Sequence, residues 1–193
     1  YQRVLIGKIE RETKNAIEKK PAGITAKLIA LVDPLTIEAL YAAAAAGVKI
    51  DLIVRGICCL VPRENIRVIS VVDRFLEHSR IVRFENGGHV EVWLSSGDWM
   101  PRNFQRRIEI LFPLLDPAAR GEASAILDLG LADAASSWLL QPDGTWAARR
   151  GGLSSQERFI EMARAEAVAL GPYDAAIEQA PKIRRRKARR RSA

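Results

Sequence analysis

Apolar and charged positions alternate along the chain with two different periods, which predict a succession of helices and strands. Between residues 6 and 17 apolar side chains recur three or four positions apart, the spacing of an amphipathic helix. Residues 23–32 are rich in Ile, Leu, Val and Thr and predict a buried strand. Asp33 and Pro34 then favour a helix start, as N-cap and first-turn residue, and Gly47 ends that helix. Residues 48–54 alternate again and predict the next strand.

This strand–helix–strand unit is expected to have parallel strands joined by a right-handed crossover. Arg55 and Gly56 would then lie at the carboxyl end of the second strand, where open α/β sheets gather their ligands. Downstream, the pattern predicts strands at 66–72 and 107–111, helices at 118–131 and 155–170, and hairpins around Asn86-Gly87-Gly88 and Asp143-Gly144. The expected fold class is α/β, with a mixed, mostly parallel β-sheet flanked by helices.

The net charge of +7 belongs to the end of the chain rather than to its body. Eight of the 30 basic residues lie between Lys182 and Arg191, and the charges of the remaining 22 are almost balanced by 23 acidic residues. Residues 182–193 therefore predict a basic, disordered tail that could touch any polyanion, such as nucleic acid, polyphosphate or an acidic membrane surface. A solvated extension without a dedicated partner is the other interpretation of this tail. The domain itself is expected to span residues 1–181.

The adjacent residues Cys58 and Cys59 argue against a disulfide framework and are expected to be reduced, buried packing residues. No Cys or His spacing resembles a zinc site. The sequence contains no signal peptide and no apolar stretch long enough to cross a bilayer, so a cytoplasmic protein is expected. The chain begins with Tyr1 rather than methionine, which is compatible with a piece of a longer polypeptide.

One histidine lies among arginines directly before a predicted strand, in Asp73-Arg74-Phe75-Leu76-Glu77-His78-Ser79-Arg80. Imidazole can accept, donate or carry a phosphoryl group near neutral pH, and guanidinium holds phosphate oxygens in a bidentate manner. Together they favour phosphoryl transfer on a polyanionic substrate. An arginine-rich solvated face with an incidental histidine is the alternative.

Several longer blocks resemble one known family, the bacterial polyphosphate kinases, in their C-terminal catalytic domain. The blocks are Val54-Arg55-Gly56-Ile57-Cys58-Cys59-Leu60, Glu64-Asn65-Ile66-Arg67, the His78 segment, Phe84-Glu85-Asn86-Gly87-Gly88 and Leu94-Ser95-Ser96-Gly97-Asp98-Trp99-Met100-Pro101-Arg102-Asn103. The resemblance runs from about residue 7 to residue 116 with few gaps. It implies reversible transfer of the terminal phosphate of ATP to inorganic polyphosphate, with Mg²⁺ accompanying the nucleotide and with metal ligands outside this chain.

The resemblance also implies a phospholipase D-like fold, in which two similar domains each give one histidine to a shared site. His78, Arg80 and Glu85 have the spacing of the phospholipase D His-Lys-Asp motif, and Ser95-Ser96 resembles the polar strand end that follows it. This chain corresponds to the second domain. The phosphorylated histidine of the family lies in the preceding domain, so the chain would supply half of an active site and need the missing domains.

Two site residues carry over from the family: Arg55 matches the arginine that contacts nucleotide phosphate, and His78 matches the second histidine of the site, expected to be catalytic. Five further arginines are candidates for holding polyphosphate or, equally, for surface ion pairs: Arg67, Arg74, Arg80, Arg102 and Arg106. His89, the other histidine, has no catalytic counterpart. The family also favours a homo-oligomer.

The sequence departs from the family at Lys27-Leu28-Ile29, where a Lys-x-Asn pattern is common, and in a shorter loop at residues 61–64. Three interpretations therefore stay open. The first is a polyphosphate kinase domain, and the second is a homodimeric phospholipase D-like phosphodiesterase. The third is a non-catalytic polyanion-binding module or a relict.

Overall fold

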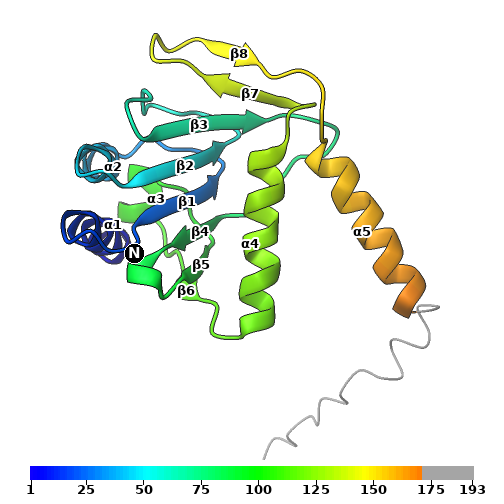
Figure 1. The fold of residues 1–193 in the computed structure, drawn as a ribbon, viewed down its shortest axis with the longest axis horizontal. Helices are drawn as coiled ribbons and strands as arrows, with labels where there is room; N and C mark the ends of the chain where they lie inside the picture. Colours follow the sequence, from blue (N-terminus) through cyan, green and yellow to red (C-terminus); the bar gives the residue numbers. More distant parts are fainter. Residues whose placement is uncertain (171–193) are drawn as a thin grey trace, which may run out of the picture. The chain divides into compact units, whose positions relative to one another are not determined.

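A computed structural model describes residues 1–170 of the chain, and residues 1–156 form one compact unit (Figure 1). The helices of the described part are α1 (Gln2–Ile17), α2 (Pro34–Ala45), α3 (Pro101–Gln105), α4 (Pro117–Ala132), α5 (Ser155–Leu170) and a 3₁₀ turn, η1 (Asn86–Gly88). The strands are β1 (Gly23–Leu28), β2 (Lys49–Val54), β3 (Ile66–Val71), β4 (Ile81–Phe84), β5 (Glu91–Ser95), β6 (Leu111–Pro113), β7 (Ser137–Leu140) and β8 (Trp146–Ala148). From residue 157 onward, α5 belongs to a second unit.

The strands form an eight-stranded mixed sheet in the order β6-β5-β4-β1-β2-β3-β7-β8. The predicted strand–helix–strand unit is confirmed, because β1 and β2 pair in parallel around α2. The expectation of a mostly parallel sheet is wrong: among the described pairs only β1–β2 and β2–β3 are parallel, and the other five are antiparallel. The connections β4–β5 and β7–β8 are too short for a crossover, so those strands must run antiparallel.

Helix α2 begins where the sequence indicated. The Asp33 carboxylate accepts hydrogen bonds from the backbone N–H of Thr36 at 2.9 Å and from its hydroxyl at 2.8 Å, and Pro34 occupies the first turn. The hairpin turn is also confirmed, with positive φ angles at Asn86, Gly87 and Gly88. Two boundaries were wrong. Strand β1 ends at Leu28 rather than at residue 32, and the strand expected at 107–111 forms later, as β6.

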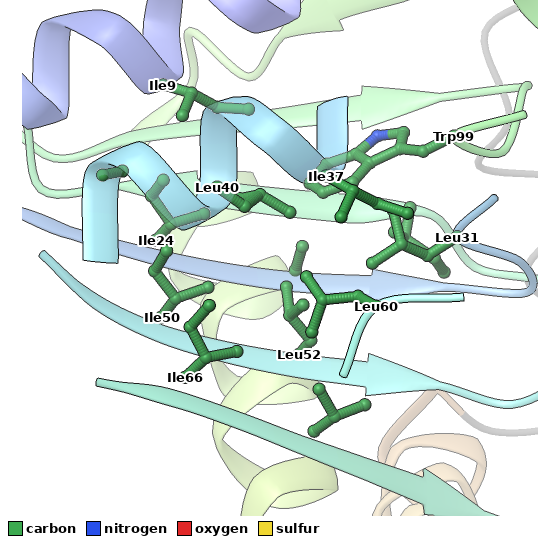
Figure 2. Close-up of a cluster of buried hydrophobic side chains, with 14 of the residues drawn as sticks. Ile9, Ile24, Leu31, Ile37, Leu40, Ile50, Leu52, Leu60, Ile66 and Trp99 are labelled. Atoms are coloured by element: carbon green, nitrogen blue, oxygen red, sulfur yellow. The ribbon is translucent and has the colours of Figure 1, made fainter. Parts of the chain in front are cut away.

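The main hydrophobic core lies between the sheet and the pair α1–α2, while α4 covers the opposite face (Figure 1). Ile9, Leu40, Ile24 and Leu52 come from four different elements and are fully or almost fully buried (Figure 2). Trp99 closes this core near the carboxyl ends of the strands and is 1% exposed. Helices therefore cover both faces of the sheet. Functional polar side chains are expected at the two edges formed by the ends of its strands, which are called the carboxyl edge and the opposite edge after the direction of β1.

A buried carboxylate ties α1 to the amino-terminal end of the central strand. Glu12 is 0% exposed and accepts hydrogen bonds from the backbone N–H groups of Gly23 and Asn86 and from the Arg11 guanidinium, at 3.0–3.2 Å. Buried charges are tolerated only when they are neutralised and hydrogen-bonded in this way. Glu12 thus fixes the helix on the sheet at the end opposite to the candidate site described below.

Candidate functional site

The predicted site residues gather at one edge of the sheet because several strands end or begin there. Strands β1, β2 and β3 all run toward this edge, and β5 ends there as well, with Ser95 paired to Leu111. Strand β4 runs the opposite way and begins there, with Ile81 paired to Lys27. The segment before β4, which contains His78, therefore meets the segment after β2, which contains Arg55, at the same edge. This arrangement of strand ends is the usual location of ligand sites in α/β sheets.

Arg55 is held by its backbone, while its guanidinium has no partner among the residues that the structure describes. The backbone N–H of Arg55 donates to Leu28 O at 3.2 Å, and its carbonyl accepts from the Ser70 hydroxyl at 3.3 Å. Within residues 1–170, no carboxylate or other acceptor bonds the guanidinium, and its Nε is buried without a partner. A half-buried arginine left unpaired at a strand end is available to an anion from solution.

Gly56 allows the chain after Arg55 to approach the end of β1 closely. Its backbone N–H donates to Ile29 O at 2.7 Å. A Cβ atom at position 56 would lie 2.8 Å from the same carbonyl oxygen, closer than real Cβ atoms come to backbone. Glycine is therefore required here by the close approach of two backbones, and this contact fixes where Arg55 lies.

His78 itself is exposed, and three side chains brace the segment that carries it. Gln156 acts like a strand partner to Phe75, donating to its carbonyl at 2.9 Å and accepting from its N–H at 2.7 Å. The buried Lys27 forms an ion pair with Glu77. Arg80 donates to the His78 carbonyl at 3.0 Å. The backbone is thus anchored on both sides of the imidazole, which makes no hydrogen bond within the described residues.

A cleft of about 510 Å³ opens beside His78, between the end of β5, strand β6 and helix α4. Its polar lining includes His78, Arg80, Ser95 and Ser96, and its far wall is apolar and formed by side chains such as Phe112 and Ile126. The Tyr1 hydroxyl lies 2.7 Å from Ser95 Oγ, and burial raises the pKa of Tyr1 to about 12, so the phenol stays neutral there. Near the cleft, hydrogen bonds from Ser96 and Asn103 lower the pKa of the Glu109 carboxyl, which keeps it ionised.

The five further arginines separate into three situations. Arg80 and Arg67 are ion-paired, with Asp98 at 3.0 Å and with Asp51 at 2.6 Å respectively. Arg67 and Asp51 face each other across β2 and β3, so they lie about 13 Å along the strand from Arg55. Arg74 lies over the ring of its neighbour Phe75 at 5.2 Å.

Arg102 and Arg106, at the two ends of the short helix α3, are exposed and unpaired within the described residues. The structure thus brings Arg55, Arg74, His78 and Arg80 to one edge, and it leaves Arg67 away from them.

Glu85 of the sequence motif and the second histidine, His89, lie elsewhere. Glu85 follows β4 at the opposite edge, so the His78–Arg80–Glu85 spacing does not bring the three side chains together. His89 is exposed just before β5, also at the opposite edge, beside a hollow of about 650 Å³ that Arg120 lines. Cys58 packs against the main core and burial raises the pKa of its thiol to about 11, whereas Cys59 is exposed, contrary to expectation.

The braces of the His78 segment were not identified from the sequence. A lysine inside the otherwise apolar strand 24–28 is a signal that Lys27 needs a buried partner. No comparable signal marks Asp98 or Gln156, which lie 18 to 81 positions from the residues they hold. Contacts over such separations depend on the fold alone.

No group of three or more His, Cys, Asp or Glu side chains that could hold a metal ion occurs among residues 1–170. In the same residues no helix is long and apolar enough to cross a membrane.

Residues 1–159 match the family described as polyphosphate kinase C-terminal domain 2. The chain belongs to the polyphosphate kinase family. It is 49% identical over 172 residues to the polyphosphate kinase of Synechocystis, an alignment that covers 84% of this chain and 24% of that protein. It is 51% identical over 148 residues to the enzyme of Neisseria gonorrhoeae, covering 74% of this chain and 22% of the relative.

The crystal structure of polyphosphate kinase from Porphyromonas gingivalis superposes with a TM-score of 0.82 at 39% sequence identity. The match covers 86% of this chain and 27% of that structure. The family inferred from the motifs and the α/β fold with a mixed sheet flanked by helices are both confirmed. The chain spans about a quarter of the length of its polyphosphate kinase relatives.

Proposed function

We propose that this chain is the C-terminal catalytic domain of a polyphosphate kinase, which transfers the terminal phosphate of ATP reversibly to inorganic polyphosphate. The observation that carries this proposal is Arg55, an arginine without an acceptor in residues 1–170, at the carboxyl edge of the sheet and on the same edge as the exposed His78. Phosphoryl transfer requires mainly positioning and neutralisation of charge, and an unpaired guanidinium with a nearby imidazole can supply both.

In this proposal Arg55 binds a nucleotide phosphate and His78 donates a proton or a hydrogen bond to the reacting phosphoryl group. The rigid bracing of the His78 segment supports the second role, because a catalytic side chain must be held to within a fraction of an ångström. The chain contains only two histidines, and His89 follows β4 at the other edge. The histidine that becomes phosphorylated would therefore come from another domain, and this chain would supply half of the site.

Magnesium would enter with the nucleotide. The carboxylates of residues 1–170 do not form a cluster that fits a metal ion, so no step of the proposed reaction is assigned to metal bound by this domain. ATP, ADP and polyphosphate are the proposed small-molecule partners, and missing N-terminal domains the proposed protein partner. We further propose a homo-oligomer in the cytoplasm, as is expected for the family.

Polyphosphate would be held by exposed arginines near the site. Arg102 and Arg106 fit this role best, because no described residue neutralises either guanidinium, whereas Arg67 and Arg80 already have carboxylate partners. Arg74 also remains a candidate at the same edge. The predicted basic tail at residues 182–193, the domain boundary at 181 and the polyanion binding expected of the tail lie outside the described residues and stay predictions.

The test uses the polypeptide at its natural full length, whose size an immunoblot of the source cells establishes. ATP formation from polyphosphate and ADP is followed by luciferase for the wild type, His78→Ala and Arg55→Ala, with His89→Ala as the matched control. We expect Arg55→Ala to lose roughly 10²–10³-fold in kcat/KM, corresponding to about 3–4 kcal/mol. His78→Ala should lose a similar factor, and His89→Ala should stay within twofold.

Two results would contradict the proposal. A wild-type polypeptide that binds polyphosphate but makes no ATP would favour the polyanion-binding module or relict. Hydrolysis of a phosphodiester such as bis-p-nitrophenyl phosphate, with a dimeric mass, would favour the phosphodiesterase.

A further inference from the structure

A buried carboxylate lies where the strands that carry Arg55 and His78 meet. Asp98 follows β5, is 5% exposed and uses both oxygens. Oδ1 accepts from the backbone N–H of Ile29 at 2.8 Å, from that of Ala30 at 3.3 Å and from Arg80 Nε at 3.1 Å. Oδ2 accepts from Arg80 Nη2 at 3.0 Å. One carboxylate thus joins the end of β1, the start of β4 and the end of β5.

Each contact of Asp98 leads to one of the two proposed site residues. The arginine that it orients donates its remaining nitrogen, Nη1, to the His78 carbonyl at 3.0 Å. The backbone that it holds at Ile29 lies against the other chain segment, where Gly56 N–H donates to Ile29 O and Arg55 N–H donates to Leu28 O. Asp98 is therefore linked to His78 through the side chain of Arg80, a connection called the histidine arm below. It is linked to Arg55 through the backbone of residues 28–30, which is called the arginine arm.

We propose that Asp98 is a positioning residue that sets the spacing between His78 and Arg55. The inference rests on the proposed function, since it names the residue that positions the two side chains of that same site. A bidentate arginine–carboxylate pair fixes angle as well as distance, and burial keeps it from being replaced by water. Reaction rates depend steeply on such spacing, because a misplacement of about 1 Å can cost about 10²-fold. Asp98 itself does not touch the substrate.

The two arms can be separated by substitution. Asn at position 98 keeps one oxygen for the amides of Ile29 and Ala30 and for Arg80 Nε, but turns an NH₂ group toward Arg80 Nη2. The bidentate pair is then broken, so the histidine arm is weakened while the arginine arm stays. Arg80→Ala removes the same arm from its other end. Ala at position 98 removes both arms. If the inference is right, Asp98→Asn and Arg80→Ala lower kcat with little change in the KM for ADP, whereas Asp98→Ala also raises that KM.

Glu12 provides a matched control. It is likewise a buried carboxylate that accepts two backbone N–H groups and one arginine, but it lies at the opposite edge of the sheet. Glu12→Gln and Glu12→Ala should therefore lower thermal stability as the Asp98 variants do, while kcat and KM stay within twofold of wild type. If kcat or KM changes in the Asp98 variants but not in the Glu12 variants, the change results from the position of Asp98 beside the site and not from general destabilisation.

The measurement is steady-state ATP synthesis from polyphosphate and ADP by the full-length polypeptide, well below the midpoint temperature of each variant. We expect a loss of at least 30-fold in kcat for Asp98→Asn and Arg80→Ala, and a rise of at least fivefold in the KM for ADP with Asp98→Ala. Arg80→Ala leaves Asp98 and its hydrogen bonds to the backbone of residues 29 and 30 in place, so it provides a second test if Asp98→Asn fails to fold.

A kcat within twofold of wild type in both Asp98→Asn and Arg80→Ala would overturn the inference, and so would equal losses in the Glu12 variants. A rise confined to the KM for polyphosphate in Arg80→Ala would also overturn it, since Arg80 would then bind substrate directly. A wild-type polypeptide without kinase activity would instead refute the proposed function, so the two failures are distinguishable.

Discussion

The close approach of the chain at Gly56 gives a prediction whose size can be worked from the structure. In Gly56→Ala the new Cβ would lie 2.8 Å from Ile29 O, which is backbone and cannot rotate away. Relieving the contact requires the two segments to separate by about 0.5 Å or more, which strains or breaks the 2.7 Å hydrogen bond between the same residues. We expect a loss of about 2–4 kcal/mol, from overpacking of about 1–3 kcal/mol and a hydrogen bond worth about 1 kcal/mol.

The assay is urea unfolding followed by circular dichroism, with Gly121→Ala as control. Gly121 lies within α4, and a Cβ there would meet no atom within 4 Å. Alanine should therefore stabilise the helix at that position by about 0.4–1 kcal/mol. Because Gly56 also fixes Arg55, its variant should raise the KM for ADP. If Gly56→Ala unfolds within 0.5 kcal/mol of wild type, the steric argument is refuted.

Three further predictions follow from buried or paired charges. Burial alone would raise the pKa of Glu91, but hydrogen bonds from Arg11, Lys8 and Trp93 hold it at about 2, below the ordinary 4.5. The stabilising contribution is therefore complete above about pH 4.5 and is lost as the pH falls through about 2. Wild type should exceed Glu91→Gln by about 1–2 kcal/mol in unfolding experiments at pH 7, and the difference should shrink steadily toward pH 2 and vanish below it. Asp133→Ala should cost about 2–4 kcal/mol, because the 0%-exposed carboxylate accepts from three backbone or hydroxyl groups, and a melting temperature unchanged within 2 °C would contradict this. Arg102→Ala should raise the KM for polyphosphate more than Arg67→Ala does, and the reverse order would favour Arg67 as the substrate contact.

Much of the fold follows from local preferences that can be recognised directly in the sequence. Asp33 and Pro34 start α2 because the carboxylate caps a free N–H and proline needs none, whatever the rest of the molecule does. Asn86-Gly87-Gly88 turns because those residues tolerate positive φ angles. The strand predicted at 107–111 was misplaced because β6 is a short strand at the edge of the sheet, set by its pairing with β5 rather than by its own pattern.

The sequence by itself determined the family and the strand ends beside which the two proposed site residues, Arg55 and His78, lie, because motifs and strand periodicity are local properties. Only the tertiary structure decided which arginine side chains lack a carboxylate partner and so remain available to bind phosphate. Arg55 and Arg67 look alike in sequence, yet in the described part of the chain Arg55 has no acceptor, whereas Arg67 faces Asp51 across neighbouring strands. It also revealed the support of the site, since Asp98 and Gln156 act on residues that only the packing of the sheet brings within hydrogen-bonding distance. Such contacts depend on register and strand order, which short-range preferences do not encode.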